Sequence, residues 1–262
     1  MTTAAVRRFL DLVGVELPVV NAPMGGLAGG ALAAAVTDAG GFGFVGGGYG
    51  DREWIDREVA LAGGRRIGIG LITWAVPDRP SAIEHVIGLG TNDVWLSFGE
   101  PAPHVAAIHA RGARAWCQVQ DVASARAAID AGADVVIAQG SEAGGHGRDR
   151  PNLSSIFAEV LALAGDIPVL AAGGVGSPED AAALVASGAS GVVLGTRLYA
   201  SHEALDTDVA KQQLVEHTAA ETTRTSAFDV LRGPEWPDGY NGRALRNDTV
   251  LDWEAHLSLI HI

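Results

Sequence analysis

Short apolar runs alternate with Ala-rich segments along most of the chain. The runs are rich in β-branched or apolar residues and bounded by glycine, and they predict strands at residues 19–24, 42–47, 66–72, 93–98, 114–119, 134–140, 168–174 and 191–196. The segments between them, such as ALAAAVTDAG, PHVAAIHARG and SPEDAAALVASG, repeat apolar residues at helical spacing. Several segments end in glycine, which is typical of a helix C-terminus.

The alternation predicts an α/β fold. Strands that are apolar along most of their length indicate a parallel sheet covered by helices on both faces. Eight strands, each followed by a helix, in 262 residues favour a (β/α)8 TIM barrel, with a doubly wound open sheet as the alternative. The periodic pattern ends near residue 220, so we divide the chain into a barrel (1–220) and a C-terminal extension (221–262). We expect the extension to be irregular chain with a short terminal helix packed on the barrel, or else a surface tail.

Composition and charge narrow the class of protein. Hydrophobic residues make up 48% of the chain and charged residues 19%, which indicates a folded protein. A net charge of -13 argues against nucleic acid or a membrane surface as partner. The single cysteine, Cys117, excludes an internal disulfide. Neither a signal peptide nor a membrane-spanning apolar stretch is visible, so we predict a cytoplasmic protein and leave homo-oligomer formation open.

Two glycine-rich turns predict an anion site. Enzymes with this barrel bind substrates at the carboxyl ends of the strands, often with phosphate after strands seven and eight. Strand seven runs into AAGGVGSPED, where Gly173 and Gly174 let backbone N–H groups approach an anion and Ser177 caps the next helix. Strand eight runs into LGTRLYAS, where Gly195 and Thr196 complete the predicted anion site. The alternative is that these glycines only permit tight turns.

A histidine in the stretch GSEAGGHGRD, which follows strand six, is the candidate catalytic residue. His146 lies in a glycine-rich loop with little apolar cover, so a role in the core is disfavoured. Its imidazole, with a pKa near neutrality, suits removal of a proton from an acidic carbon or a hydrogen bond to a developing anion. Glu142 is either the base instead or a residue that orients the loop. No metal site is predicted, because His104 and His109 lie five residues apart on a predicted helix and point to different faces.

Five blocks in this order, NAPMGG, LSFGEP, VIAQGSEAGGHG, PVLAAGGV and LGTRLYAS, give the chain a family resemblance. It resembles the nitronate monooxygenases, formerly called 2-nitropropane dioxygenases, which are FMN-dependent barrels. The resemblance implies FMN as cofactor and a small-molecule substrate and O2 as partners. It also implies a reaction, the oxidation of alkyl nitronates, and in some members of neutral nitroalkanes, to a carbonyl compound and nitrite.

The resemblance assigns His146 as the active-site histidine and places Gln118 at the pyrimidine edge of the flavin. The cofactor-binding residues it implies end a strand or form the turn after it: Pro23, Met24, Gly25, Gln118, Gln139, Gly144, Gly145, Gly173, Gly174, Gly195 and Thr196. The chain departs from the family at Gly70, where many members have asparagine, and it lacks most of an extra helical segment that many members carry.

Two other classes of function stay open. One is an FMN-dependent reductase of the same fold that takes hydride from NAD(P)H for a quinone or an enoyl thioester. The other uses no flavin and is a phosphosugar-type barrel or a binding module. An aldolase of that type would need a Schiff-base lysine on a strand, whereas the only lysine, Lys211, lies in the last helical region.

Overall fold

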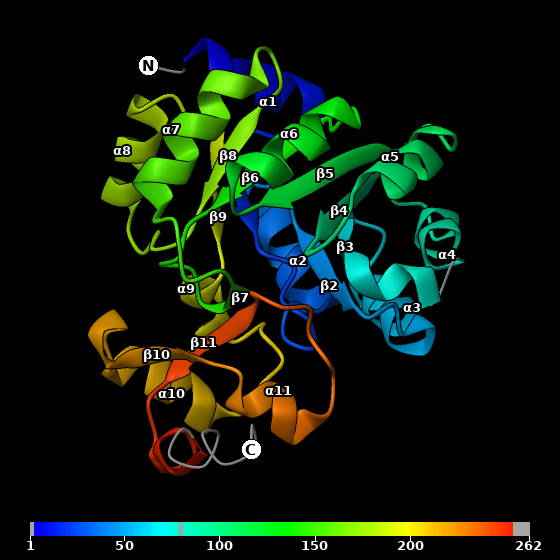
Figure 1. Ribbon diagram of the computed structural model, residues 1–262. Helices are drawn as coiled ribbons and strands as arrows, with labels where there is room; N and C mark the ends of the chain where they lie inside the picture. Colours follow the sequence, from blue (N-terminus) through cyan, green and yellow to red (C-terminus); the bar gives the residue numbers. More distant parts are fainter. Residues whose placement is uncertain (1–2, 79–80, 254–262) are drawn as a thin grey trace.

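Parallel strands form the central sheet of the protein, and the computed structural model describes residues 3–78 and 81–253. Eight strands follow one another in the order β1-β9-β8-β6-β5-β4-β3-β2 (Figure 1). Their bounds are β1 Val19–Asn21, β2 Phe44–Gly48, β3 Gly68–Ile72, β4 Asp93–Ser97, β5 Arg114–Val119, β6 Val135–Gln139, β8 Val169–Ala172 and β9 Gly191–Leu194. Each predicted strand is present, and most are shorter than predicted. In β8 and β9 the predicted residues Gly173, Gly174 and Gly195 lie beyond the end of the strand.

The two end strands of this order, β1 and β2, meet and close the barrel. Val20 forms a parallel bridge with Phe42, and the Phe42 N–H donates to the Val19 carbonyl over 2.9 Å. The buried side chain of Asn21 extends the seam: its Oδ1 accepts from the Phe44 N–H at 2.7 Å, and its Nδ2 donates to the Phe44 carbonyl at 2.8 Å. At this point of the seam the side-chain amide of Asn21 makes the two hydrogen bonds that the backbone of a paired strand would otherwise make. The (β/α)8 barrel prediction is confirmed, and the open-sheet alternative is wrong.

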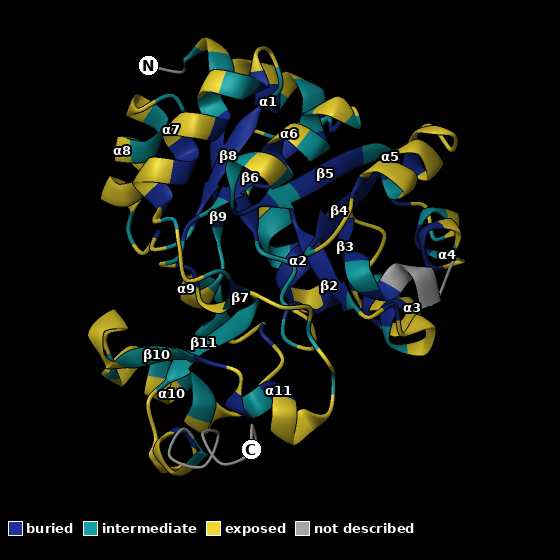
Figure 2. Ribbon diagram, viewed as in Figure 1, coloured by how far each residue is buried: buried dark blue, intermediate teal, exposed yellow. Residues whose placement is uncertain are grey.

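Helices surround the barrel, and their outer faces are exposed (Figure 2). They are α2 Gly30–Asp38, α3 Arg52–Leu61, α4 Ala82–Gly88, α5 Ala102–His109, α6 Val122–Asp130, α7 Leu153–Ala164 and α8 Pro178–Ala186, with the short η1 Thr73–Asp78 after β3. Ser177 caps α8 through a reciprocal pair with Asp180, as predicted. None of the helices in the described ranges is both long and apolar enough to cross a membrane.

Aromatic side chains fill the barrel interior. Trp95 and Trp116 are buried and lie parallel, with ring centroids 6.3 Å apart, and Phe44 contacts both edge-on. Helix α1 (Ala4–Val13) adds Phe9 and Val13 to this cluster and covers the end of the barrel opposite the C-terminal extension (Figure 1). A closed end on one side leaves the other end of the barrel for a site.

The C-terminal extension is more regular than predicted. Strands β10 (Thr222–Thr225) and β11 (Asn241–Leu245) form an antiparallel sheet with β7 (Gly145–Gly147), and α11 (Ala227–Arg232) lies between them in sequence. The expectation of irregular chain is therefore wrong. It failed because β10 and β11 are half-buried along most of their length, so their sequences do not alternate. A helical turn begins at residue 248, and the predicted terminal helix beyond 253 lies outside the described residues. The division at residue 220 stays a prediction.

Three short helices complete the chain between β9 and β10. They are α9 Thr196–Tyr199, α10 Asp208–Glu216 and η2 Ala219–Glu221. Helix α9 begins directly after β9, so Thr196 lies at the carboxyl end of the barrel. Helix α10 lies below the barrel in the view of Figure 1, on the side of the extension.

Candidate active site

The loops at the carboxyl ends of the strands bring the predicted site residues to one end of the barrel. This end faces the extension, and β7, which carries His146, lies between the two (Figure 1). Gln118 lies on β5, and Gln139 is the last residue of the neighbouring strand β6. The candidate site is therefore at the end where (β/α)8 enzymes hold theirs.

A network of side-chain amides lies inside this end of the barrel. The Oε1 of Gln118 accepts hydrogen bonds from Trp95 Nε1 and Ser97 Oγ, both at 3.2 Å. The Nε2 of Gln118 donates to Gln139 Oε1 at 2.8 Å, and Gln139 Nε2 donates to the His146 carbonyl at 3.3 Å. These bonds fix which way each amide points. The network links the interior of the barrel to the strand that carries the histidine.

Glycine lets four loops approach one another at this end. A Cβ on Gly144 would lie 2.5 Å from Thr196 Oγ1, and a Cβ on Gly173 would lie 3.1 Å from the Ala143 nitrogen. Gly173 and Gly174 have φ of +116° and +70°, a conformation that favours glycine. Gly195 lies near the loop after β1, since a Cβ on it would lie 3.9 Å from Met24 Sδ. The loops after β1, β6, β8 and β9 thus meet with backbone amides and a threonine hydroxyl, a donor set that suits a phosphate.

The loop after β1 passes directly over β2 and β3. A Cβ on Gly46 would lie 2.3 Å from the Met24 carbonyl oxygen, and a Cβ on Gly70 would lie 2.3 Å from Pro23 Cβ. A Cβ on Gly25 would lie 3.7 Å from the Gly48 Cα. The proline ring therefore occupies the space that a side chain at position 70 would need.

His146 is held by the extension. Its Nε2 lies 2.8 Å from Asp229 Oδ1 on α11. Its ring stacks on Trp236, with centroids 3.7 Å apart and an interplanar angle of 5°, and Phe98 contacts it edge-on at 6.4 Å. Burial lowers the pKa of the His146 imidazole below its ordinary value, against the opposing effect of the Asp229 carboxylate. The expectation of little apolar cover is wrong, since residues far along the chain supply that cover.

Glu142 has a structural partner. Its Oε2 accepts the backbone N–H of Leu153, the first residue of α7, at 2.8 Å. A carboxylate at this position satisfies a free donor at the start of the helix. Of the two roles left open for Glu142, the contact favours orientation of the loop.

Two arginines of the extension hold the loop between β6 and β7. Arg224 Nη2 donates to the carbonyls of Ser141 and Ala143 at 3.1 and 3.3 Å, and Arg243 Nη2 donates to Ser141 at 2.8 Å. The two residues lie opposite each other in β10 and β11. Burial and the neighbouring Arg243 lower the pKa of the Arg224 guanidinium. The extension therefore fixes both the histidine and the loop before it.

Several site residues were missed from the sequence. Asp229 and Trp236 lie in a segment without periodicity, so no local signal marks them. Phe98 could have been found, because it sits in the block LSFGEP. In the structure it is the one described non-glycine residue with positive φ, +62°. Gln120 Nε2 donates to Gln139 Oε1 at 2.5 Å and adds a further amide to the network.

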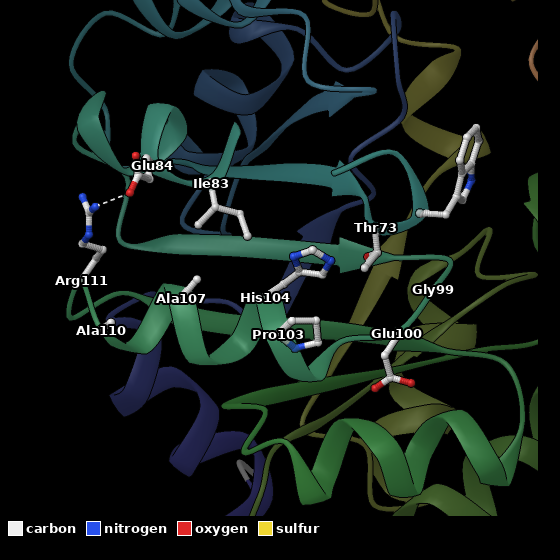
Figure 3. A pocket seen from close by; sticks show the side chains of 11 residues that line it. Thr73, Ile83, Glu84, Gly99, Glu100, Pro103, His104, Ala107, Ala110 and Arg111 are labelled. Atoms are coloured by element: carbon white, nitrogen blue, oxygen red, sulfur yellow. Dashed lines mark hydrogen bonds and ion pairs between the residues drawn. The ribbon is translucent and has the colours of Figure 1, made fainter. Parts of the chain in front are cut away.

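A groove of about 740 Å³ lies on the flank of the barrel between α4 and α5 (Figure 3). None of the predicted site residues lines it. Burial lowers the pKa of the His104 imidazole on this groove, and Glu100 opposes the effect. Trp74, which lines the groove, also contacts Trp236, the ring that stacks on His146, edge-on at 5.5 Å. Among the described residues, no group of three or more His, Cys, Asp or Glu side chains is placed to hold a metal ion.

A closed (β/α)8 barrel with a histidine, an amide network and a phosphate-suited cradle at its open end defines an enzyme of the TIM-barrel class. The chain belongs to the nitronate monooxygenase family, whose sequence profile matches residues 7–62 and 76–258. It is accordingly an oxidoreductase.

Individual proteins are also similar to this chain in sequence or structure. A nitronate monooxygenase of Metarhizium robertsii is 34% identical over 268 residues, covering 90% of this chain and 74% of the relative. The structure of a nitroalkane oxidase from Streptomyces ansochromogenes matches with a TM-score of 0.79 and 30% identity over 94% of this chain and 81% of that one. The structure of FabK from Thermotoga maritima matches with a TM-score of 0.83 and 28% identity over 95% and 77%.

Proposed function

We propose that this protein oxidises alkyl nitronates with O2 to a carbonyl compound and nitrite, uses FMN as its cofactor, and also accepts neutral nitroalkanes. The observation that carries the proposal is the position of His146, half-buried and hydrogen-bonded at the open end of a barrel whose family is that of the nitronate monooxygenases. The family and its structural neighbours are flavoproteins, and we propose that the flavin bound here is FMN.

The residues at the open end suit FMN. Gly173, Gly174, Gly195 and Thr196 would hold the phosphate through backbone N–H groups and one hydroxyl. The side-chain amides of Gln118 and Gln139 would donate to and accept from the polar edge of the ring. The backbone of Pro23, Met24 and Gly25 would line the ring, while Gly144 and Gly145 would let the next loop pass close to it. FMN, when bound, supplies the redox chemistry.

His146 would do two things with its imidazole. A nitronate is already an anion and so favours the imidazolium, whose second N–H would donate a hydrogen bond to a nitro oxygen and hold the substrate in place. With a neutral nitroalkane, His146 would first take the α-proton: the C–H bond breaks, the proton moves to the imidazole, and the electron pair moves onto the nitro group, which yields the nitronate in the site. A lowered pKa keeps the imidazole unprotonated and able to act as base at neutral pH.

Two measurements test the function. In air, the protein with propyl-1-nitronate should consume O2 and release nitrite. Without O2, propyl-1-nitronate should bleach the visible absorbance of the holoenzyme, whereas NADH and NADPH should not. Bleaching by a nicotinamide alone would overturn the proposal in favour of the reductase. A cytoplasmic location and formation of a homo-oligomer stay predictions.

A further inference from the structure

We propose that Asp229 is a positioning residue that fixes His146 with its proton on Nε2, so that Nδ1 is the nitrogen that takes the α-proton of a neutral nitroalkane. The inference deepens the proposed function and rests on it for the identity of the substrate. Its structural half, the state of the imidazole, can be measured without any turnover.

The hydrogen bond between the two residues decides which nitrogen is free. His146 Nε2 and Asp229 Oδ1 lie 2.8 Å apart, and both side chains are largely removed from solvent, with 25% and 11% of their surfaces exposed. A carboxylate can only accept, so Nε2 must donate. A neutral imidazole carries one N–H, and the lone pair is then on Nδ1.

The aromatic contacts hold the ring in this orientation. Trp236 lies flat against one face, and Phe98 meets the ring edge-on. Trp236 is itself held, because its Nε1 donates to the Tyr49 hydroxyl at 3.1 Å. The stack fixes the plane of the imidazole, and the carboxylate selects between the two ways in which the ring can lie in that plane. Together they leave one nitrogen for the reaction.

The charges around the ring explain why the carboxylate matters during proton transfer. Asp229 favours the imidazolium, whereas Arg232 on α11 and Arg224 on β10 disfavour it, and burial disfavours it most. The other rings packed against His146, Trp236 and Phe98, carry no charge. Asp229 is thus the group in contact with the ring that stabilises the product of proton abstraction. An amide at this position would still accept the hydrogen bond but would not supply the charge.

The first test reads the tautomer directly. In protein with ¹⁵N-labelled histidine, long-range ¹H–¹⁵N spectra near pH 7.5 separate a protonated from an unprotonated ring nitrogen. His146 is assigned by the signals lost in His146→Gln. We expect a protonated Nε2 and an unprotonated Nδ1, and we expect Asp229→Ala to give a mixture of both forms. A proton on Nδ1 in the unaltered protein would overturn the inference.

The second test asks whether Asp229 acts through His146. Asp229→Asn should lower kcat with nitroethane by about 10-fold or more, because a general base contributes about 10²–10⁴-fold. It should change kcat with ethylnitronate less than about 3-fold. Asp238→Asn removes the same negative charge from an exposed residue of the extension and should leave both rates unchanged. In a His146→Ala background, Asp229→Asn should have no further effect.

The outcomes separate the two proposals. Equal losses with both substrates, no loss with either, or an undiminished loss in the His146→Ala background would overturn the role of Asp229. An unaltered enzyme that turns over ethylnitronate but not nitroethane would overturn the role of Nδ1 as base and leave the nitronate activity standing. An enzyme that turns over neither would overturn the proposed function, while the tautomer measurement would still decide the state of His146.

Discussion

Replacing Asn21 by leucine should weaken the barrel where β1 meets β2. The side chain of Asn21 is fully buried and makes two short hydrogen bonds to the backbone of Phe44 across this seam. Leucine has a similar shape but no polar group. The N–H and the carbonyl of Phe44 would therefore stay buried without their present partner.

The two buried groups left without a partner set the expected loss in the free energy of unfolding. A buried donor or acceptor that loses its partner costs about 1–3 kcal/mol, so two such groups amount to about 2–6 kcal/mol. A folded domain is stable by about 5–15 kcal/mol in total. The substitution should remove a large part of that free energy, because the seam otherwise depends on the bridge between Val20 and Phe42.

Urea unfolding followed by tryptophan fluorescence measures this loss, since Trp95 and Trp116 are buried in the barrel interior. Asn92→Leu, an exposed position before β4, is the matched control and should change the free energy of unfolding by less than about 0.5 kcal/mol. If Asn21→Leu behaves like this control, the amide does not close the barrel and the reasoning is refuted.

Four further predictions concern the site and the core. His146→Ala should keep the flavin and lower turnover of nitroethane by about 10²–10⁴-fold, measured as nitrite release; unchanged turnover would exclude proton transfer to this residue. Because burial lowers the pKa of His146, kcat/KM for nitroethane should be lost only as the pH falls well below about 6.5, and a loss that begins above 6.5 would contradict the assignment. Gly70→Asn should destabilise the protein by about 1–3 kcal/mol in urea, because its Cβ would meet Pro23; unaltered stability would mean that the loop gives way. Burial raises the pKa of the Cys117 thiol to about 12, so a disulfide reagent at pH 8 should label it only in urea, and rapid labelling of the folded protein would refute its burial.

The barrel could be predicted from the sequence because its signals are local. Each strand is a short apolar run and each helix a periodic segment, and the turns between them carry glycine or a capping residue such as Ser177. The same locality explains the order of the strands in the barrel, since most neighbours in the sheet follow one another along the chain.

The surroundings of His146 could not be predicted, because they come from distant parts of the chain. The glycines beside it indicated an open loop, yet the ring is covered by Trp236 and bonded to Asp229, 83 positions away. The strands that carry this cover, β10 and β11, are half-buried and show no period. The close approach of Pro23 to Gly70 is likewise visible only in three dimensions.

The most direct measurement is the identity and amount of the chromophore bound to the purified protein. We expect a yellow protein that, after denaturation, releases about one FMN per chain, as expected of a single site. Protein that is colourless and fails to take up FMN added in excess would contradict the claim that this barrel is a flavin-dependent nitronate oxidase.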